Sequence, residues 1–419
     1  MAHNAAPMRR TPTGATRTGH GDGRTGLRIL IAAGGSGGHV FSGLALARAL
    51  TARDPTSVVR FAGTSRGIEA RAVPAAGFPL DLLPILPLFR RPAPETVGAP
   101  FAAVRGVLAA ERLIRRHRVE VVCGMGAYVT LPVAVGAWRA GVPVVLHEQN
   151  AVSGIANRLA ARVATKVALG VAEAAAAFPV PRERTVVVGN PVRPELAGLD
   201  RTALRDQGLA AFCLDPGRRT LVVFGGSGGA RRINEALVAA TSHWPEPTAV
   251  QILHACGRGF EPVVRAAWAA ADPAGRGLTV QVVPFIDRMD LAYAAADLVL
   301  TRAGGSTIAE LTVAGVPAVL VPLARATAGH QAANARAVAV TGGAVVVDDP
   351  DLAGPRLAAT VAPLLVDPER LAAMAKAMRG LGRPDAAQEL AALVVAARRM
   401  APGEFLDRGH RLVDRNPTG

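Results

Sequence analysis

The chain has 419 residues, of which 50% are hydrophobic and 19% charged, so it is long enough for two or three domains and is not a disordered chain. Its formal net charge is +15, and Lys166 and Lys376 are the only lysines among 47 basic residues. This charge fits either a compositional habit of the genome or an anionic partner. Cys123, Cys213 and Cys256 have neither disulfide nor metal-ligand spacing, which favours a reducing, cytoplasmic compartment.

Two segments bear on membrane insertion. Residues 1–26 are basic and contain no apolar run, so we expect a flexible tail rather than a secretory signal, with a second tail at 401–419. The uncharged stretch Val121–Trp138 contains three glycines and Pro132 and barely reaches spanning length. We therefore expect no transmembrane helix, which leaves a soluble or membrane-surface protein.

Short β-rich runs alternate with helical runs in the first half of the chain. The apolar run Leu27–Ala33 predicts a buried strand, and Gly43–Arg53 predicts the helix that follows it. The further strands expected in this half are Val58–Ala62, Val119–Cys123, Val142–Leu146, Lys166–Leu169 and Thr185–Val188. This alternation predicts βαβ units and a parallel sheet.

The same rhythm begins again in the second half, where the helix Ala230–Ala240 follows the first strand. The strands expected there are Thr220–Phe224, Val250–His254, Thr279–Val283, Leu298–Thr301, Ala318–Val321 and Ala344–Val347. We expect an α/β protein of two Rossmann-like domains, 27–190 and 218–400, joined by a linker region at 191–217. Their parallel sheets should face each other across a cleft that holds the ligand near the carboxyl ends of the strands.

Each half opens with the same glycine-rich turn between a strand and a helix. Residues 34–38 and 225–229 both read Gly-Gly-Ser-Gly-Gly. Glycine lets the backbone approach an anion closely, and the helix start that follows offers free N–H groups and the positive end of the helix dipole. Neither turn fits the dinucleotide or Walker spacing. Two such turns at matching places nevertheless favour phosphate binding.

Two acidic motifs allow more than one interpretation. Thr307–Glu310 has capping-box spacing, so Glu310 is either a helix cap or a carboxylate that accepts from two vicinal hydroxyls of a ribose. Asp349 and Asp351 have the spacing that some metal-dependent sugar transferases use, but the intervening proline predicts a turn. We expect no metal site.

Six motifs together resemble the MurG family, the UDP-N-acetylglucosamine transferases that complete lipid II in peptidoglycan synthesis. They are residues 34–50 (GGSGGHVFSGLALARAL), 147–158 (HEQNAVSGIANR), 189–193 (GNPVR), 224–231, 284–323 and 330–335 (HQAANA). The resemblance covers roughly residues 27–395. It implies a two-domain GT-B fold, UDP-N-acetylglucosamine as donor, and lipid I as acceptor, with inversion and with neither cofactor nor required metal. Lipid I is undecaprenyl-diphosphoryl-N-acetylmuramoyl-pentapeptide.

The resemblance also implies roles for single residues around the cleft. Those that face both substrates or the donor sugar would be Ser36, Gly37, Gly38, Asn150 and Gln331. Those that hold the donor diphosphate, the uracil and the ribose would be Arg193 and Ser227, Phe285 and Ile286, and Glu310, respectively. Those that place backbone N–H groups beside the sugar and phosphate would be Gly305, Ser306, Thr307, Ile308 and Ala309.

The expected reaction is direct displacement at the anomeric carbon, in which a hydroxyl of the muramoyl sugar attacks as UDP leaves. His39 is the first choice for the base, because it follows the first glycine turn and an imidazole titrates near neutral pH. Alternatively, His39 binds the acceptor diphosphate. His147 and Glu148 are the rival bases.

Several positions depart from the family pattern and leave other functions open. Gly228 stands where a glutamine is expected, and Ala127, Thr130 and Leu131 alter a second conserved stretch. A related GT-B transferase acting on another polyprenyl or natural-product acceptor is one alternative. A UDP-sugar epimerase and a non-catalytic nucleotide-sugar-binding protein are the others. Nucleic-acid binding is not expected, since few aromatic residues are available to stack on bases.

An apolar block lies in residues 78–91 (FPLDLLPILPLFRR). Its large side chains are Leu82, Leu83, Ile85, Leu86, Leu88 and Phe89, and it ends in Arg90 and Arg91. It is either a loop packed on the first domain or a patch that enters an anionic inner-membrane surface. The family resemblance favours the patch and places the protein peripherally on the cytoplasmic face of the cell membrane. The sequence sets no oligomeric state.

Overall fold

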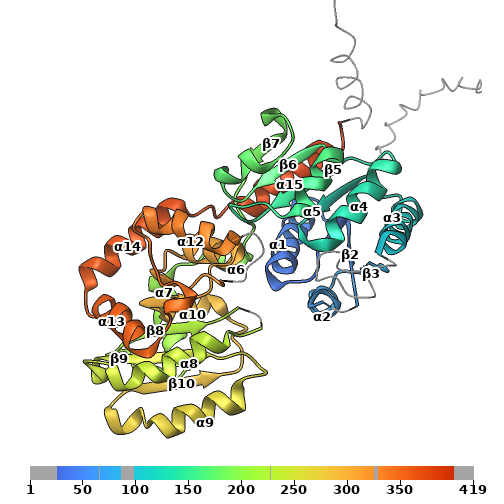
Figure 1. The fold of residues 1–419 in the computed structure, drawn as a ribbon. Coiled ribbons are helices and arrows are strands. Elements are labelled where there is room, and N and C mark those ends of the chain that lie inside the picture. Colours follow the sequence, from blue (N-terminus) through green and yellow to red (C-terminus); the bar gives the residue numbers. More distant parts are fainter. Residues whose placement is uncertain (1–25, 66, 86–98, 227, 325–328, 401–419) are drawn as a thin grey trace, which may run out of the picture.

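The computed structural model describes residues 26–65, 67–85, 99–226, 228–324 and 329–400, which form two lobes, each a parallel sheet flanked by helices (Figure 1). The N-lobe strands are β1 (Arg28–Ala32), β2 (Val58–Gly63), β3 (Leu80–Leu82), β4 (Val121–Gly124), β5 (Val144–Glu148), β6 (Lys166–Leu169) and β7 (Thr185–Val187). The C-lobe strands are β8 (Arg219–Phe224), β9 (Val250–Ala255), β10 (Thr279–Val283), β11 (Leu298–Thr301), β12 (Ala318–Leu320) and β13 (Ala344–Val346). Every strand predicted from the sequence is confirmed.

Helices cover both faces of the sheets. The first five helices are α1 (Gly37–Arg53), α2 (Glu69–Ala75), α3 (Ala99–Arg116), α4 (Ala127–Arg139) and α5 (Ile155–Ala160). The next five are α6 (Pro194–Ala197), α7 (Arg201–Ala211), α8 (Arg231–Ala240), α9 (Glu261–Ala271) and α10 (Met289–Ala295). The last are α11 (Gly305–Ala314), α12 (His330–Val340), α13 (Gly354–Leu365), α14 (Pro368–Leu381) and α15 (Ala386–Ala397). Within the described residues, no helix combines the length and apolarity that crossing a bilayer requires.

The strand order of both sheets places the glycine turns at equivalent points. The orders are β3-β2-β1-β4-β5-β6-β7 and β10-β9-β8-β11-β12-β13, and all the pairings are parallel. In each sheet the order reverses between the first strand and its neighbour, β1 beside β4 and β8 beside β11. Open parallel sheets bind ligands at this reversal, outside the carboxyl ends of the strands. The turns at 34–38 and 225–229 follow β1 and β8, so the topology brings both to ligand-binding positions.

The domain boundaries differ from the prediction in two ways. The expected linker region 191–217 belongs to the C-lobe, because Leu196, Leu209 and Leu214 are buried in that core and α7 packs on α10. The last helix, α15, crosses back and packs on α1 in the N-lobe, where Leu390 and Val394 join the core (Figure 1). An apolar helical pattern does not indicate which of two similar sheets the helix packs against.

The chain therefore passes twice between the lobes, once after β7 and once before α15. The two crossings touch: a Cβ added at Gly189 would lie 2.8 Å from Cβ of Arg383 and 3.1 Å from Cβ of Ala386. Gly189 also has a φ of +86°, which favours glycine. Both passages between the lobes are thus packed against each other.

The apolar block at 78–91 is only partly a surface feature. Residues 80–82 form the edge strand β3, which the sequence analysis did not anticipate because it is short and lies between two prolines. Leu83 and Ile85 are buried in the N-lobe core, so for these two side chains the membrane interpretation is wrong. Leu82 is exposed. Leu86, Leu88, Phe89, Arg90 and Arg91 lie outside the described residues.

Candidate active site

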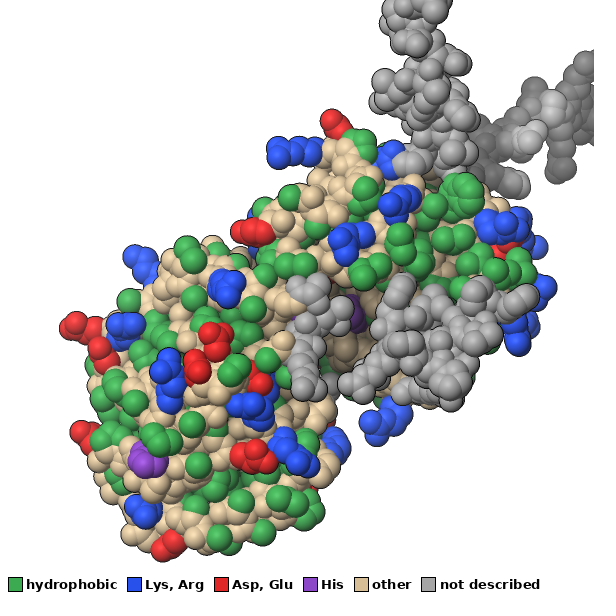
Figure 2. Space-filling view, in the orientation of Figure 1, with side chains coloured by type: hydrophobic (Ala, Val, Ile, Leu, Met, Phe, Trp, Pro, Cys, Tyr) green, Lys and Arg blue, Asp and Glu red, His purple; other side chains and the backbone are tan. Residues whose placement is uncertain are grey.

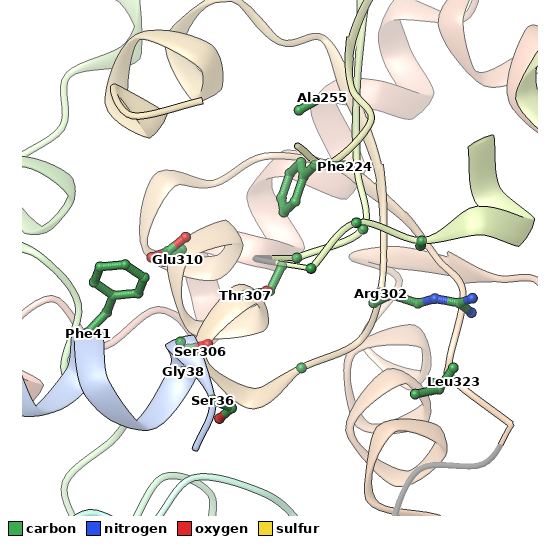
Figure 3. Close-up of a pocket in the computed structure, with 18 of the residues that line it drawn as sticks. Ser36, Gly38, Phe41, Phe224, Ala255, Arg302, Ser306, Thr307, Glu310 and Leu323 are labelled. Atoms are coloured by element: carbon green, nitrogen blue, oxygen red, sulfur yellow. The ribbon is translucent and has the colours of Figure 1, made fainter. Parts of the chain in front are cut away.

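A cavity of about 910 Å³ lies between the lobes, bounded by the residues that follow β1, β8 and β11. In Figure 3, Ser36 and Gly38 at the start of α1 face Ser306 and Thr307 at the start of α11, and Glu310 lies beside Phe41. The predicted site residues that line the cavity are Ser36, Gly37, Gly38, His39, Asn150, Arg193, Phe285, Ile286, Gly305, Ser306, Thr307, Glu310 and Gln331. Ser227 lies outside the described residues. Gly225, Gly226, Gly228 and Gly229 of the second turn also line the cavity, so the two glycine turns meet there.

The first glycine turn carries His39 into the cavity wall. The helix α1 begins at Gly37, earlier than expected, so the last two glycines of the turn form its first residues. Nδ1 of His39 is 2.7 Å from Oγ of Ser36, and the other edge of the ring lies against Gly126, where a Cβ would come within 2.8 Å of Nε2. Burial, reinforced by neighbouring His147 and His330, lowers the pKa of His39 to about 4. The imidazole is therefore neutral at pH 7.

A buried carboxylate supports the first glycine turn from below. Oε2 of Glu69 accepts the backbone N–H of Gly35 at 3.1 Å, and its Oε1 accepts the N–H and the hydroxyl of Thr64. The hydroxyl of Thr64 also lies 2.9 Å from that of Tyr128. Glu69 could not be predicted from the sequence, because one acidic residue at the start of a short helix resembles an ordinary surface residue.

The two rival bases lie behind the cavity wall. His147 is fully buried, its Nε2 is 2.9 Å from the carbonyl of Gly189, and burial lowers its pKa to about 4. The carboxylate of Glu148 accepts from the backbone N–H groups of Asn150 and Gly154 and from the side chains of Asn150 and Asn157. Neither residue lines the cavity. These contacts hold the loop after β5, and a base at either position stays a prediction that this arrangement does not support.

Arg193 and Glu310 close one end of the cavity. Nη2 of Arg193 is 3.4 Å from Oε1 of Glu310, and the guanidinium lies 5.8 Å from the centre of the Phe41 ring. Nε of Arg193 is buried without a hydrogen-bond partner. Oε2 of Glu310 accepts from the hydroxyl of Tyr293 at 2.9 Å. Burial raises the pKa of Glu310, and Arg193 opposes part of that effect.

The helix α11 presents its first N–H groups to the cavity. It begins at Gly305 with Gly304 as N-cap, so Thr307 and Glu310 lie inside the helix and the capping-box interpretation of Glu310 is wrong. The backbone N–H of Ile308 already donates to the carbonyl of Gly304 at 2.9 Å. Ala309 lies one residue further into the helix. The side chains of Ile308 and Ala309 both pack against the C-lobe core. Only the first three N–H groups of the helix are thus left for a ligand.

The opposite end of the cavity is formed by a buried ion pair. Nη1 of Arg302 lies 2.6 Å from Oδ1 of Asp349, and Nε of Arg232 lies 3.6 Å from Oδ2 of the same carboxylate. Residues Asp349–Asp351 form a 3₁₀ turn, as the intervening proline predicted. The carboxylate of Asp349 is thus committed to arginines. Among the described residues, no cluster of three metal-ligating side chains occurs.

Two domain families of a known enzyme class match the chain. Residues 29–169 match the glycosyltransferase family 28 N-terminal domain, and residues 220–390 match the glycosyltransferase family 28 C-terminal domain. Together with two parallel-sheet lobes around a cavity lined by glycine turns, this defines a GT-B glycosyltransferase. The predicted fold class is confirmed.

Close relatives specify the family further. The chain is 44% identical over 372 residues to the UDP-N-acetylglucosamine–N-acetylmuramyl-(pentapeptide) pyrophosphoryl-undecaprenol N-acetylglucosamine transferase of Nocardioides sp. (strain ATCC BAA-499 / JS614), covering 88% of this chain and 98% of that protein. It is 32% identical to Acinetobacter baumannii MurG, with a TM-score of 0.69 and coverage of 88% and 99%. The chain belongs to the MurG family of N-acetylglucosaminyltransferases. The resemblance found in the sequence is confirmed.

The epimerase alternative has a structural neighbour but little sequence support. A UDP-GlcNAc 2-epimerase from Neisseria meningitidis, bound to UDP-GlcNAc, superimposes with a TM-score of 0.63 over 88% of this chain and all of that chain (100%), at 12% identity. Identity this low shows the shared fold alone. The transferase assignment therefore stands on the higher-identity relatives.

Proposed function

We propose that the protein transfers N-acetylglucosamine from UDP-N-acetylglucosamine to lipid I, giving lipid II, at a membrane surface. The observation that carries the proposal is the meeting of both glycine turns and the start of α11 at one cavity, with Arg193 and Glu310 at its end. The relatives named above supply the identity of donor and acceptor. Backbone N–H groups and a guanidinium bound the same cavity, which supports binding of a nucleoside diphosphate there.

The leaving diphosphate is neutralised by groups of the C-lobe. Arg193 has a buried N–H without a partner, and the first N–H groups of α11 lie at the same cavity. A charge-assisted hydrogen bond contributes about 1.5–3 kcal/mol, and a partly buried helix start adds up to about 2 kcal/mol. Glu310 would accept from the ribose hydroxyls. These groups provide charge stabilisation without a divalent ion.

His39 would act as the base. The acceptor hydroxyl oxygen bonds to the anomeric carbon as the bond from that carbon to the β-phosphate oxygen breaks, and the hydroxyl proton passes to the imidazole. With Nδ1–H donating to Oγ of Ser36, Nε2 keeps its lone pair and would receive the proton. The lowered pKa keeps the ring neutral and ready to accept. A positioned base contributes about 10²–10⁴-fold in rate.

One assay tests the reaction and separates it from the alternatives. Purified protein is incubated with radiolabelled UDP-N-acetylglucosamine, with and without a short-chain lipid I analogue. We expect labelled disaccharide lipid and release of UDP that depends on the acceptor. Conversion of the donor alone to its epimer would indicate an epimerase, and binding without either product would indicate a non-catalytic protein. Either result would contradict the proposal.

The outer face of α5 would form a membrane-facing surface. Ile155 and Leu159 lie one turn apart and are 44% and 38% exposed, and Arg158 and Arg162 are exposed beside them. Figure 2 shows hydrophobic and basic side chains gathered together over this lobe. Each inserted side chain would contribute about 1.5–3 kcal/mol and each nearby arginine about 1 kcal/mol, which suffices for reversible attachment. This helix follows the loop that carries Asn150 at the cavity.

Vesicle sedimentation tests this surface. The variant Ile155→Asp/Leu159→Asp should lose binding to anionic phospholipid vesicles. Val263→Asp is the matched control, because Val263 is 72% exposed on α9 of the other lobe, and it should bind as the wild type does. Equal binding by all three proteins would rule out α5 as the membrane face.

A further inference from the structure

Asn334 on α12 links the two lobes beside the cavity. Its side chain is 6% exposed and makes three hydrogen bonds. Oδ1 accepts the backbone N–H of Ala151 at 2.9 Å, and Nδ2 donates to the carbonyl of Ala303 at 3.2 Å and to Oδ1 of Asn150 at 3.0 Å. Asn150 and Ala151 follow β5 in the N-lobe, whereas Ala303 follows β11 in the C-lobe. One carboxamide thus ties the loops after two strands of different sheets.

The orientation of this carboxamide is fixed by backbone groups. A backbone N–H can only donate and a carbonyl can only accept, so Oδ1 of Asn334 must face Ala151 and Nδ2 must face Ala303. The amide nitrogen of Asn334 then requires an acceptor on Asn150, which only Oδ1 provides. Asn334 therefore dictates which way the amide of Asn150 is turned.

The other side of Asn150 confirms this orientation independently. Its Nδ2 donates to Oε1 of Glu148 at 3.2 Å, and a carboxylate accepts only from a donor. Asn190 holds the same loop from below, since its Nδ2 donates to the carbonyls of Gln149 and Gly305 at 2.9 and 3.2 Å. With its oxygen engaged by Asn334 and one N–H by Glu148, Asn150 has one amide hydrogen left at the cavity.

We propose that Asn334 is a positioning residue that sets Asn150 as a hydrogen-bond donor toward an oxygen of the transferred sugar. The inference rests on the proposed function, because it assumes a sugar nucleotide in this cavity. Asn334 itself lies outside the set of residues that line the cavity, and it acts through Asn150. The uridine diphosphate part of the donor, held at the Arg193 end, should not sense Asn334.

The test measures binding of UDP and of UDP-N-acetylglucosamine separately by calorimetry. Asn334→Asp retains the acceptor for Ala151 and loses both donations, so Asn150 is no longer turned. We expect the Kd for the sugar nucleotide to rise about three- to tenfold, the loss of roughly one neutral hydrogen bond, with the Kd for UDP unchanged within about twofold. Asn334→Ala should do the same. Val340→Ala, at an exposed position of the same helix, should change neither.

A double-mutant cycle shows whether Asn334 acts through Asn150. In an Asn150→Ala background, Asn334→Asp should have no further effect on affinity for the sugar nucleotide. An additive effect, or an equal loss of affinity for UDP, would overturn the inference by showing a merely structural role. An unchanged ratio of the affinities for UDP and UDP-N-acetylglucosamine in Asn334→Asp would also overturn the inference. If the wild-type protein bound neither nucleotide, the proposed function would fail first, and this inference with it.

Discussion

Replacing Arg193 removes the guanidinium that closes one end of the cavity. Three contacts hold it: Oε1 of Glu310, the carbonyl of Asp287 and the ring of Phe41. Its Nε is left without a partner. Because the arginine is positioned before any ligand arrives, a diphosphate gains its hydrogen bond without ordering a flexible side chain. Arg193→Ala leaves a void there and deprives buried Glu310 of its cation.

The expected cost follows from one charge-assisted hydrogen bond, about 1.5–3 kcal/mol, which is about a 10- to 150-fold rise in the Kd for UDP. Isothermal titration calorimetry measures it directly. Arg193→Lys keeps the charge but not the planar guanidinium, so its Kd for UDP should lie between those of the wild type and Arg193→Ala. Arg48→Ala, which removes the α1 arginine of an exposed ion pair with Glu195 on α6, is the control and should bind UDP as the wild type does. A Kd for Arg193→Ala within about threefold of the wild-type value would refute the reasoning.

Three further outcomes follow from the structure. His39→Ala should lower kcat at least about 100-fold while leaving UDP affinity unchanged. In the wild-type protein, kcat/KM should decline on the acid side near pH 4, where the imidazole becomes protonated. A decline of kcat/KM near pH 6.5 would contradict this. Ala127 has a φ of +65°, so Ala127→Gly should stabilise the N-lobe by about 0.5 kcal/mol, measured by urea denaturation. This value is the strain relieved in the left-handed backbone minus the entropy cost of ordering a glycine. Leu390 is 0% exposed, so Leu390→Ala should destabilise the N-lobe by about 2–5 kcal/mol, measured by hydrogen exchange in α1, whereas Leu381→Ala, at a 40% exposed position, should not.

The sequence predicted the strands well because strands buried on both faces are continuous apolar runs. Leu27–Ala33 and Thr220–Phe224 are of this kind, and each is followed directly by its glycine turn. The edge strand β3 escaped notice because it has three residues and only one neighbouring strand. The position of α15 escaped because helical periodicity identifies a buried face but not the sheet that buries it.

The candidate site was predicted less completely, because side-chain roles depend on contacts across the chain. His39 could be singled out by its place after a glycine turn, whereas His147, at the end of an apolar run, is buried in the core. Glu69 and Asn334 could not be found, since the backbone N–H groups of Gly35 and Ala151 that they hold are 34 and 183 residues away along the chain. Motif resemblance located the cavity, and only the fold separated the residues that line it from those that support it.

The return of α15 to the N-lobe determines the order in which the two cores can be completed during synthesis. All the C-lobe elements from α6 to α14 precede residue 382, while the N-lobe core needs Leu390 and Val394. The half that is translated first therefore acquires its last packing helix only after the other half has fully left the ribosome. Until then the apolar face of α1 that α15 covers stays open to solvent or to a chaperone.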